Sequence, residues 1–196
     1  MSDRPRWFTD TKPGHSQWYV DRFRRLAADG VDLEGEARLI DAMVGRGARI
    51  LDAGCGTGRV AGALHRRGHD VVAVDVDPEL VAAAQADHPG PSYAVADLSR
   101  LELDGEPFDL VVSAGNVMVF LAPGSERSVL QRMRDHLRPG GRAVLGFRRE
   151  DSYPYERFDA DAEAVGLVRE HRFATWELDP FAADADFAVT VLRRPA

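Results

Sequence analysis

A ten-residue stretch, ILDAGCGTGR at positions 50–59, constrains the fold of this chain more than any other part of it. Positions 49–52 predict a short buried strand, and apolar side chains recur at helical spacing after residue 59. Three glycines lie in the bend between these elements: Gly54, Gly56 and Gly58. Because glycine has no Cβ, the backbone can adopt positive φ there and a ligand can approach the peptide planes closely. The following helix points its unbonded N–H groups at the same place, so the stretch predicts a cofactor site.

The glycine spacing, G-x-G-x-G, differs from the dinucleotide fingerprint G-x-G-x-x-G/A, whose last position here would be Arg59. That difference weakens a nicotinamide interpretation. With Asp52 at the start of the loop, the stretch resembles the first motif of class I methyltransferases, which use S-adenosylmethionine (SAM). The resemblance implies that Asp52 and the three glycines contact SAM. A glycine-rich turn can also serve only as a tight turn in an α/β fold, and that alternative stays open.

A second strand is predicted at positions 70–75, DVVAVD, whose apolar run suits a strand buried on both faces. Asp75 ends this strand about 20 residues beyond the glycine loop, where a carboxylate can accept both hydroxyls of a ribose. In the resembled family the matching acidic residue does this for SAM, and the next residue, here Val76, lies against the adenine. Asp75 could instead cap a helix, but Asp77 followed by Pro78 already supplies that cap.

A third strand is predicted at positions 93–96, with Asp97 and Leu98 at its exit. The resemblance implies that Asp97 accepts from the adenine amino group and that the backbone N–H of Leu98 meets a ring nitrogen. An aspartate at a strand exit is also a common turn residue, so both interpretations remain. The predicted cofactor-binding set is therefore Asp52, Gly54, Gly56, Gly58, Asp75, Val76, Asp97 and Leu98.

Two further segments resemble the same family: FDLV at 108–111 and LRPGGR at 137–142. The first begins a predicted fourth strand, and the second is expected to turn a helix into a fifth strand at 143–147. A short helix and two strands, at 167–177 and 187–192, follow. The element order predicts an α/β fold: a single doubly wound, mostly parallel seven-stranded sheet with an antiparallel C-terminal hairpin and helices on both faces.

The length of 196 residues suits one domain, expected to span 1–196. Within it we expect four regions: a flexible arm at 1–14, N-terminal cap helices at 15–45, a cofactor-binding core at 49–147, and an acceptor-side loop with the terminal hairpin at 148–196. Trp7 and Phe8 are unusually apolar for an arm, and in the resembled family this segment often covers the cofactor cleft. The first cap helix is expected to begin near Ser16, a candidate N-cap.

The acceptor side is less constrained by the sequence. The loop after the fourth strand carries Asn116 but lacks the Asn-Pro-Pro run of amine-methylating relatives, so it does not support amine methylation. His15 and Asn116 are the candidate catalytic residues, His15 as a base and Asn116 as an orienting amide. Candidates for an acceptor pocket are Trp18, Tyr19, Tyr153 and Tyr155, although aromatic residues at helical spacing are commonly core residues.

Composition limits the partners. The net charge of −7 disfavours nucleic acid, whose phosphates are neutralised by Lys and Arg, and favours a small-molecule acceptor. No apolar run approaches the length of a membrane span, and the N-terminus lacks an apolar signal core, so a cytoplasmic protein without membrane association is expected. Cys55 is the only cysteine, which excludes a thiolate zinc cluster, and no metal site is predicted.

These observations favour a SAM-dependent methyltransferase that acts on a small-molecule acceptor by in-line displacement. Two alternatives stay open: a non-catalytic SAM-binding regulatory module, because no base is evident, and a nicotinamide-dependent oxidoreductase. The oligomeric state, the acceptor and the methylated atom do not follow from the sequence.

Overall fold

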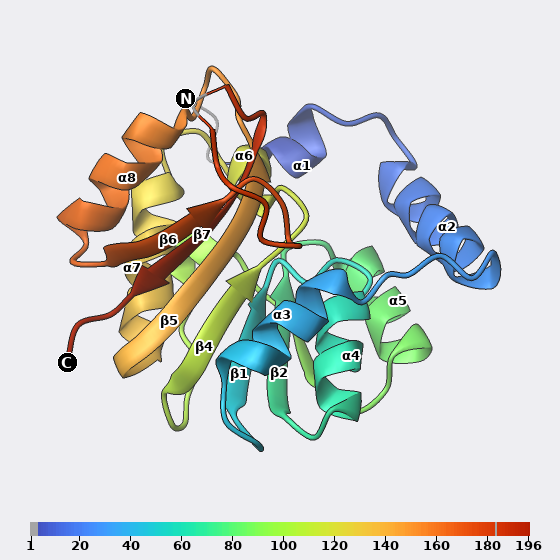
Figure 1. Cartoon of the computed structure of the whole chain (residues 1–196). Coiled ribbons are helices and arrows are strands. Elements are labelled where there is room, and N and C mark those ends of the chain that lie inside the picture. The colour runs from blue at the N-terminus through green and yellow to red at the C-terminus, as the bar shows by residue number, and fades with distance from the viewer. Residues whose placement is uncertain (1–3, 183) are drawn as a thin grey trace.

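A computed structural model describes residues 4–182 and 184–196, and within them seven strands form one sheet in the order β3-β2-β1-β4-β5-β7-β6 (Figure 1). The strands are β1 (Arg49–Ala53), β2 (Asp70–Asp75), β3 (Ser92–Val95), β4 (Phe108–Ser113), β5 (Leu137–Arg148), β6 (Val168–Phe173) and β7 (Phe187–Arg193). Strands β1 to β5 run parallel, and β7 is antiparallel to both β5 and β6. The predicted fold class is confirmed.

Helices cover both faces of the sheet. They are α1 (Arg6–Thr9), α2 (His15–Ala28), α3 (Gly35–Met43), α4 (Arg59–Arg66), α5 (Pro78–Asp87), α6 (Val117–Phe120), α7 (Glu126–His136) and α8 (Tyr155–Ala164), with a 3-10 turn, η1 (Leu98–Arg100). One apolar cluster packs α7 and α8 against the sheet, and a second packs α3 and α4 against the opposite face. The central strands β1 and β4 are buried almost throughout, which explains their apolar sequences.

The strand order places a switch point between β1 and β4. From β1 the chain continues outward through β2 to β3, and then returns to β4 on the other side of β1. Open α/β sheets bind ligands in the crevice outside the carboxyl ends of the strands at such a point. The loops after β1, β2, β3 and β4 therefore meet at one edge of the sheet.

The predicted strand limits differ most at β5, which was expected at 143–147 but begins at Leu137. The LRPGGR segment enters the strand as an irregularity, because the pairing of β4 with β5 shifts register between Phe108 and Leu110. Gly140 adopts a φ of 75°, and a Cβ on Gly141 would lie 2.9 Å from the carbonyl oxygen of Arg138. The two glycines thus allow a bulged start of the strand. Near the C-terminus β6 is shorter than the predicted strand at 167–177.

The N-terminal helices α1 and α2 lie apart from the sheet, on the side of α5 and α6 (Figure 1). Their apolar side chains join a small third cluster around Val20, Leu80 and Ala83, to which Trp7 and Tyr19 are added. Helix α2 begins at His15 after Gly14, whose φ is 79°, so the expected cap at Ser16 is wrong. The expected arm at 1–14 contains α1, and the proposed division into four regions stays a prediction.

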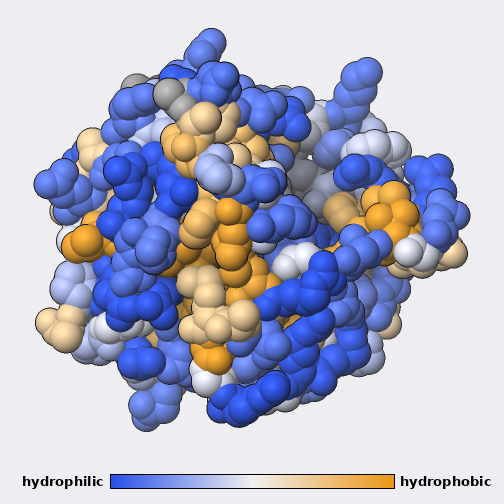
Figure 2. Space-filling model, viewed as in Figure 1, coloured by the Kyte–Doolittle hydropathy of each residue, from blue (hydrophilic) through white to orange (hydrophobic). Residues whose placement is uncertain are grey.

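Among the described residues, no helix is both long and apolar enough to cross a membrane. The surface on the side seen in Figure 2 is largely hydrophilic, with apolar side chains gathered in a central band and beside α2.

Candidate functional site

A pocket lies at the switch point, lined by the loops after β1 to β4 and by the N-terminal helices. The sequence-predicted residues that line it are Asp52, Gly54, Gly56, Asp75, Val76, Asp97, Leu98 and Tyr19. The other lining residues include Trp7, Thr57, Arg59, Leu80, Gly115, Val117, Phe120 and Leu121. Seven of the eight predicted cofactor residues are thus brought together, from the carboxyl ends of three strands, β1, β2 and β3.

The glycine loop is held in a conformation that requires glycine. Gly54, Gly56 and Gly58 have φ values of 84°, 53° and 78°. The N–H groups of Gly54 and Cys55 donate to the carbonyl of Val74 at 2.8 and 2.9 Å, which fixes the loop to the end of β2. A Cβ on Gly54 would clash with Val117, so this glycine also allows the loop after β4 to approach.

Gly58 is the one predicted cofactor residue that does not line the pocket. It precedes α4, and a Cβ there would lie 2.7 Å from the Cβ of Ala84 and 2.8 Å from the hydroxyl of Tyr93. Its lack of a side chain lets the residue before α4 lie close to Ala84 of α5 and Tyr93 of β3. Gly58 therefore has a packing role at the start of α4, and its contact with the cofactor stays a prediction.

Asp75 is oriented by its own neighbourhood. Its Oδ2 accepts the backbone N–H of Gly56 at 2.8 Å, and its Oδ1 accepts that of Asp77 at 3.0 Å. Each carboxylate oxygen can accept more than one hydrogen bond, so both can still receive a hydroxyl. Burial raises the pKa of Asp75 above its ordinary value. The two N–H bonds fix the side chain at the exit of β2.

Asp52 is the most buried charged group of the pocket. Its side chain is 1% exposed, and its Oδ2 has no hydrogen-bond partner among the described residues. Burial raises the pKa of Asp52 to about 7. A buried carboxylate without a partner is unfavourable unless a ligand supplies one, so this oxygen marks a place for a hydrogen-bond donor or a cation.

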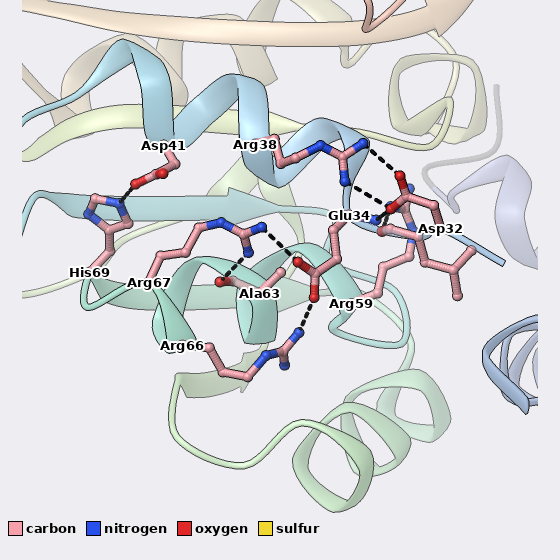
Figure 3. Close-up of polar contacts among 10 residues, drawn as sticks. Asp32, Glu34, Arg38, Asp41, Arg59, Ala63, Arg66, Arg67 and His69 are labelled. Atoms are coloured by element: carbon pink, nitrogen blue, oxygen red, sulfur yellow. Dashed lines mark hydrogen bonds and ion pairs between the residues drawn. The ribbon is translucent and has the colours of Figure 1, made fainter. Parts of the chain in front are cut away.

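Arg59 is the one positively charged side chain among the described residues that line the pocket. Its guanidinium forms a bidentate pair with Glu36 and donates to the carbonyl of Leu33 at 2.9 Å. Neighbouring ion pairs hold the segment before α3 against α4, because Glu34 accepts from both Arg66 and Arg67 (Figure 3). These contacts fix where the Arg59 cation lies.

Asp97 has a structural role that the sequence left open. Its Oδ1 accepts the backbone N–H of Ser99 at 2.8 Å and the hydroxyl of the same residue at 2.7 Å, which caps η1. Its Oδ2 has no hydrogen-bond partner among the described residues. Leu98 beside it is 6% exposed and contributes to the pocket wall. The turn role of Asp97 and a contact with a ligand are therefore compatible.

Tyr19 connects the loops that follow β1 and β4. Its hydroxyl lies 3.9 Å from the position of a Cβ on Gly56 and 3.8 Å from that of a Cβ on Gly115. Among the described residues this hydroxyl has no hydrogen-bond partner, and burial raises the pKa of Tyr19. At neutral pH it is therefore an uncharged group that can donate or accept one hydrogen bond in the pocket.

Tyr153 and Tyr155 do not reach the pocket. They are 0% and 3% exposed, within the apolar cluster between α8 and β5. The hydroxyl of Tyr153 donates to Asp161 at 3.1 Å, and that of Tyr155 donates to the carbonyl of Phe147 at 3.2 Å. The segment after β5 was expected to be a loop, but α8 begins within it at Tyr155, and the rings of Tyr153 and Tyr155 pack inward. Their assignment to the acceptor pocket is wrong.

The remaining candidates lie beside the pocket without lining it. Trp18 is 50% exposed and stacks on His15, whose ring makes an edge contact with Trp7 at 4.8 Å between centroids. Asn116 has a φ of 67° and accepts the backbone N–H of Arg148 at 2.7 Å, which ties the β4 exit to β5. The structure therefore does not bring His15 and Asn116 together at a reacting position.

Sequence reasoning missed several pocket residues. Trp7 was noted as unusually apolar for an arm, but its partner Asp77 lies 70 positions away. Arg59 was considered only as a residue that breaks the dinucleotide fingerprint. Thr57 carries no sequence signal of its own beyond its place in the glycine loop.

The sheet order, the reversed last strand and the crevice that the loops after β1 and β2 line define a Rossmann-like methyltransferase domain. A family model described as "Methyltransferase domain" matches residues 50–141. The chain is 46% identical to a TehB-like SAM-dependent methyltransferase of Corynebacterium glutamicum, and that crystal structure aligns with a TM-score of 0.88 over 93% of this chain and 100% of that chain. The protein belongs to the class I SAM-dependent methyltransferase family, whose cofactor is SAM.

Curated relatives are similar over shorter stretches. The magnesium-protoporphyrin O-methyltransferase of Rhodobacter capsulatus is 39% identical over 53% of this chain and 48% of its own length. A malonyl-[acyl-carrier protein] O-methyltransferase of Enterobacter lignolyticus is 32% identical over 62% of this chain and 49% of its own length. The chain thus spans about half the length of these relatives.

Proposed function

We propose that this protein transfers a methyl group from SAM to a small-molecule acceptor. The observation that carries the proposal is that one pocket contains two carboxylates and one cation. They are Asp52, whose Oδ2 has no hydrogen-bond partner among the described residues, the oriented carboxylate of Asp75, and the guanidinium of Arg59. SAM presents an ammonium group, a carboxylate and a ribose diol, and the donor and acceptor groups of the pocket match all three. When bound, SAM supplies a methyl group activated by its sulfonium, so in-line displacement by an acceptor completes the reaction.

In this proposal Asp75 receives the ribose hydroxyls, because Gly56 and Asp77 already hold both of its oxygens in place. Val76 and Leu98 form apolar walls for the adenine, and Asp97 offers its remaining oxygen to the adenine amino group. Gly54 and Gly56 leave their peptide planes uncovered for close approach.

Asp52 and Arg59 hold the amino-acid end. An ammonium gives the buried Asp52 oxygen the partner it lacks. Arg59 keeps its pair with Glu36 and offers its positive charge to a carboxylate. Glu36 thereby limits how strongly Arg59 attracts an anion, and it fixes the guanidinium in one orientation.

Catalysis in this proposal consists mainly of positioning, because an acceptor held in line with the sulfonium needs little further activation. Tyr19 is the residue best placed for that work, since its unpartnered hydroxyl spans the loops after β1 and β4. His15 and Asn116, the candidates from the sequence, do not line the pocket, and their catalytic roles have less support than that of Tyr19.

A small organic acceptor is the substrate class that the comparisons support. The names of the curated relatives refer to O-methylation of a metalloporphyrin and of a malonyl group on a carrier protein. Val117, Phe120 and Trp7 give the pocket an apolar lining. The negative net charge argues against a nucleic acid acceptor.

The test combines binding with turnover. Calorimetric titrations with SAM, S-adenosylhomocysteine and NADH should give similar affinities for the first two and none for NADH. Release of S-adenosylhomocysteine should follow when a panel of small acceptors is added. Asp75→Ala should weaken SAM binding by about 1.5–3 kcal/mol. Asp104→Ala, which changes an exposed loop carboxylate, is the matched control and should bind normally.

Each part of the proposal can fail separately. Tight NADH binding without SAM binding would replace it with the oxidoreductase hypothesis. SAM binding without turnover on any acceptor would favour a non-catalytic SAM-binding module. Normal SAM affinity in Asp75→Ala, together with a lower melting temperature, would make Asp75 a structural residue.

A further inference from the structure

The N-terminal segment 5–19 forms one wall of the cofactor pocket. Pro5, Trp7 and Tyr19 from this segment line the pocket together with residues of the sheet loops. The indole of Trp7 makes edge contacts with Phe120 and Tyr19, both with ring centroids 5.5 Å apart. We name this segment the cover. In Figure 1 it corresponds to α1 and the start of α2, which stand apart from the sheet.

Two hydrogen-bond donors of the cover meet on one side chain of the body, Asp77. Its Oδ2 accepts the indole N–H of Trp7 at 2.7 Å and also the hydroxyl of Ser16. Its Oδ1 accepts the backbone N–H of Glu79 at 2.9 Å and caps α5. The two oxygens thus have different tasks, since one caps a helix and the other holds the cover.

Asp77 is also coupled to the ribose carboxylate. Its backbone N–H donates to Oδ1 of Asp75 at 3.0 Å, and only Val76 separates the two residues in the chain. A ligand that engages Asp75 and Val76 therefore lies directly against the residue that holds Trp7. Occupancy of the pocket and the closed position of the cover are expected to reinforce one another.

The cover makes further contacts with the body. Near its start, the Arg6 side chain donates to the exposed hydroxyl of Ser152 at 2.8 Å, and the Arg6 backbone N–H donates to the carbonyl of Leu121 at 3.5 Å.

The cover and α2 reach the body through the third apolar cluster, around Val20, Leu80 and Ala83, which is separate from the two clusters of the sheet. At the far end of α2, Arg24 pairs with Asp87 at the surface. Exposed ion pairs contribute little, and a segment with few buried apolar contacts opens at lower free energy than the whole domain.

We propose that Asp77 is a positioning residue that holds Trp7 over the cofactor, and that the release of SAM and of its demethylated product requires the Asp77 contacts to Trp7 and Ser16 to break. Trp7 becomes a cofactor-binding residue that the glycine-loop motifs do not include. The proposal rests on the cofactor placement proposed above. It predicts that weakening these two contacts changes the kinetics of cofactor exchange more than it changes the stability of the fold.

The test uses the double variant Trp7→Phe with Ser16→Ala, which removes both donors and leaves Asp77 free to cap α5. Dissociation of radiolabelled SAM is followed by rapid filtration after dilution into unlabelled SAM. We expect at least a tenfold faster release and faster amide hydrogen exchange across residues 5–19, with the melting temperature nearly unchanged. The KM for SAM should rise without a fall in kcat. Asp77→Ser, which keeps a capping oxygen for α5, should behave in the same way.

Trp18→Phe is the matched control. It makes the same chemical change in α2 at a half-exposed residue that does not contact Asp77, so its release rate should equal that of the parent. Unchanged SAM release in the double variant overturns the proposal, and so does an equally faster release in Trp18→Phe. The proposed function would stand in both cases, provided that the parent binds SAM and Asp75→Ala binds it more weakly. If the parent protein does not bind SAM, the proposed function fails instead.

Discussion

The pKa of Asp52 leads to a specific prediction for the pH dependence of SAM binding. Burial raises this pKa to about 7, so the free protein carries a half-protonated Asp52 at neutral pH. If the ionised carboxylate receives the ammonium group of SAM, protonation of Asp52 competes with binding. Affinity should therefore rise with pH through about 7. It should fall again once the ammonium group loses its own proton.

The magnitude follows from the two ionised fractions. With an α-amino pKa of about 7.8, the product of the fractions rises about sixfold from about pH 6 to its maximum near about pH 7.4, or about 1 kcal/mol, and declines at higher pH. The apparent pKa values belong to the interacting pair, so a bell-shaped profile is the expected form. Asp75 also has a raised pKa and could contribute to the same limb. A variant is needed to separate them.

The assay is calorimetric titration of SAM at constant ionic strength from pH 5.5 to 8.5, for the parent protein and for Asp52→Asn. The variant should bind more weakly at pH 7.4 by about 1.5–3 kcal/mol, because it loses a charged acceptor. It should also lose the acidic limb of the profile. Asp104→Asn, at an exposed loop position, controls for the loss of one negative charge and should keep the parent profile. A flat parent profile, or an acidic limb that persists in Asp52→Asn, refutes the role given to Asp52.

Three other substitutions test separate parts of the site. Tyr19→Phe should lower turnover at saturating SAM by about 10- to 100-fold with unchanged SAM affinity, because a positioned hydroxyl contributes to acceptor orientation. Steady-state kinetics with the best acceptor measure this effect. A kcat equal to that of the parent would show that Tyr19 has no role in the reaction. Gly54→Ala forces a Cβ against Val117 at a φ of 84°, so SAM binding and melting temperature should both fall, as calorimetry and thermal unfolding can show. Tyr153→Phe should lower the free energy of unfolding by about 1 kcal/mol in urea, since it removes a buried hydrogen bond to Asp161, and should leave turnover unchanged.

The fold and the cofactor side could be predicted because their signals are local. Each of Asp52, Asp75 and Asp97 stands at the carboxyl end of a strand or directly after one, and parallel strands bring such ends to one edge of the sheet. Apolar runs identified the strands, and the glycine loop identified the turn. The packing role of Gly58 could not be predicted, because its neighbour Ala84 belongs to α5, which the loop sequence does not reveal.

The acceptor side could not be predicted because its contacts join residues far apart in the chain. Tyr153 and Tyr155 follow a strand at the ligand-binding edge, which suggested a polar loop over the pocket. Both tyrosine rings instead pack in the core against Phe147 and Phe158, whose ring centroids are 5.1 Å apart. Helix α8 begins at Tyr155 and packs this aromatic cluster against the sheet, and the sequence of the segment alone does not reveal that packing.

Asp77 illustrates how one residue can carry a local and a long-range role at once. The sequence identified it as the cap of α5, and the structure agrees, since Oδ1 accepts from Glu79. A cap of this kind uses one oxygen, so the second remains available to segments that the local pattern cannot identify. Trp7 and Ser16 use it from 70 and 61 positions away. Because Asp75 lies two residues earlier, the same short turn after β2 links ribose recognition to the position of the N-terminal cover.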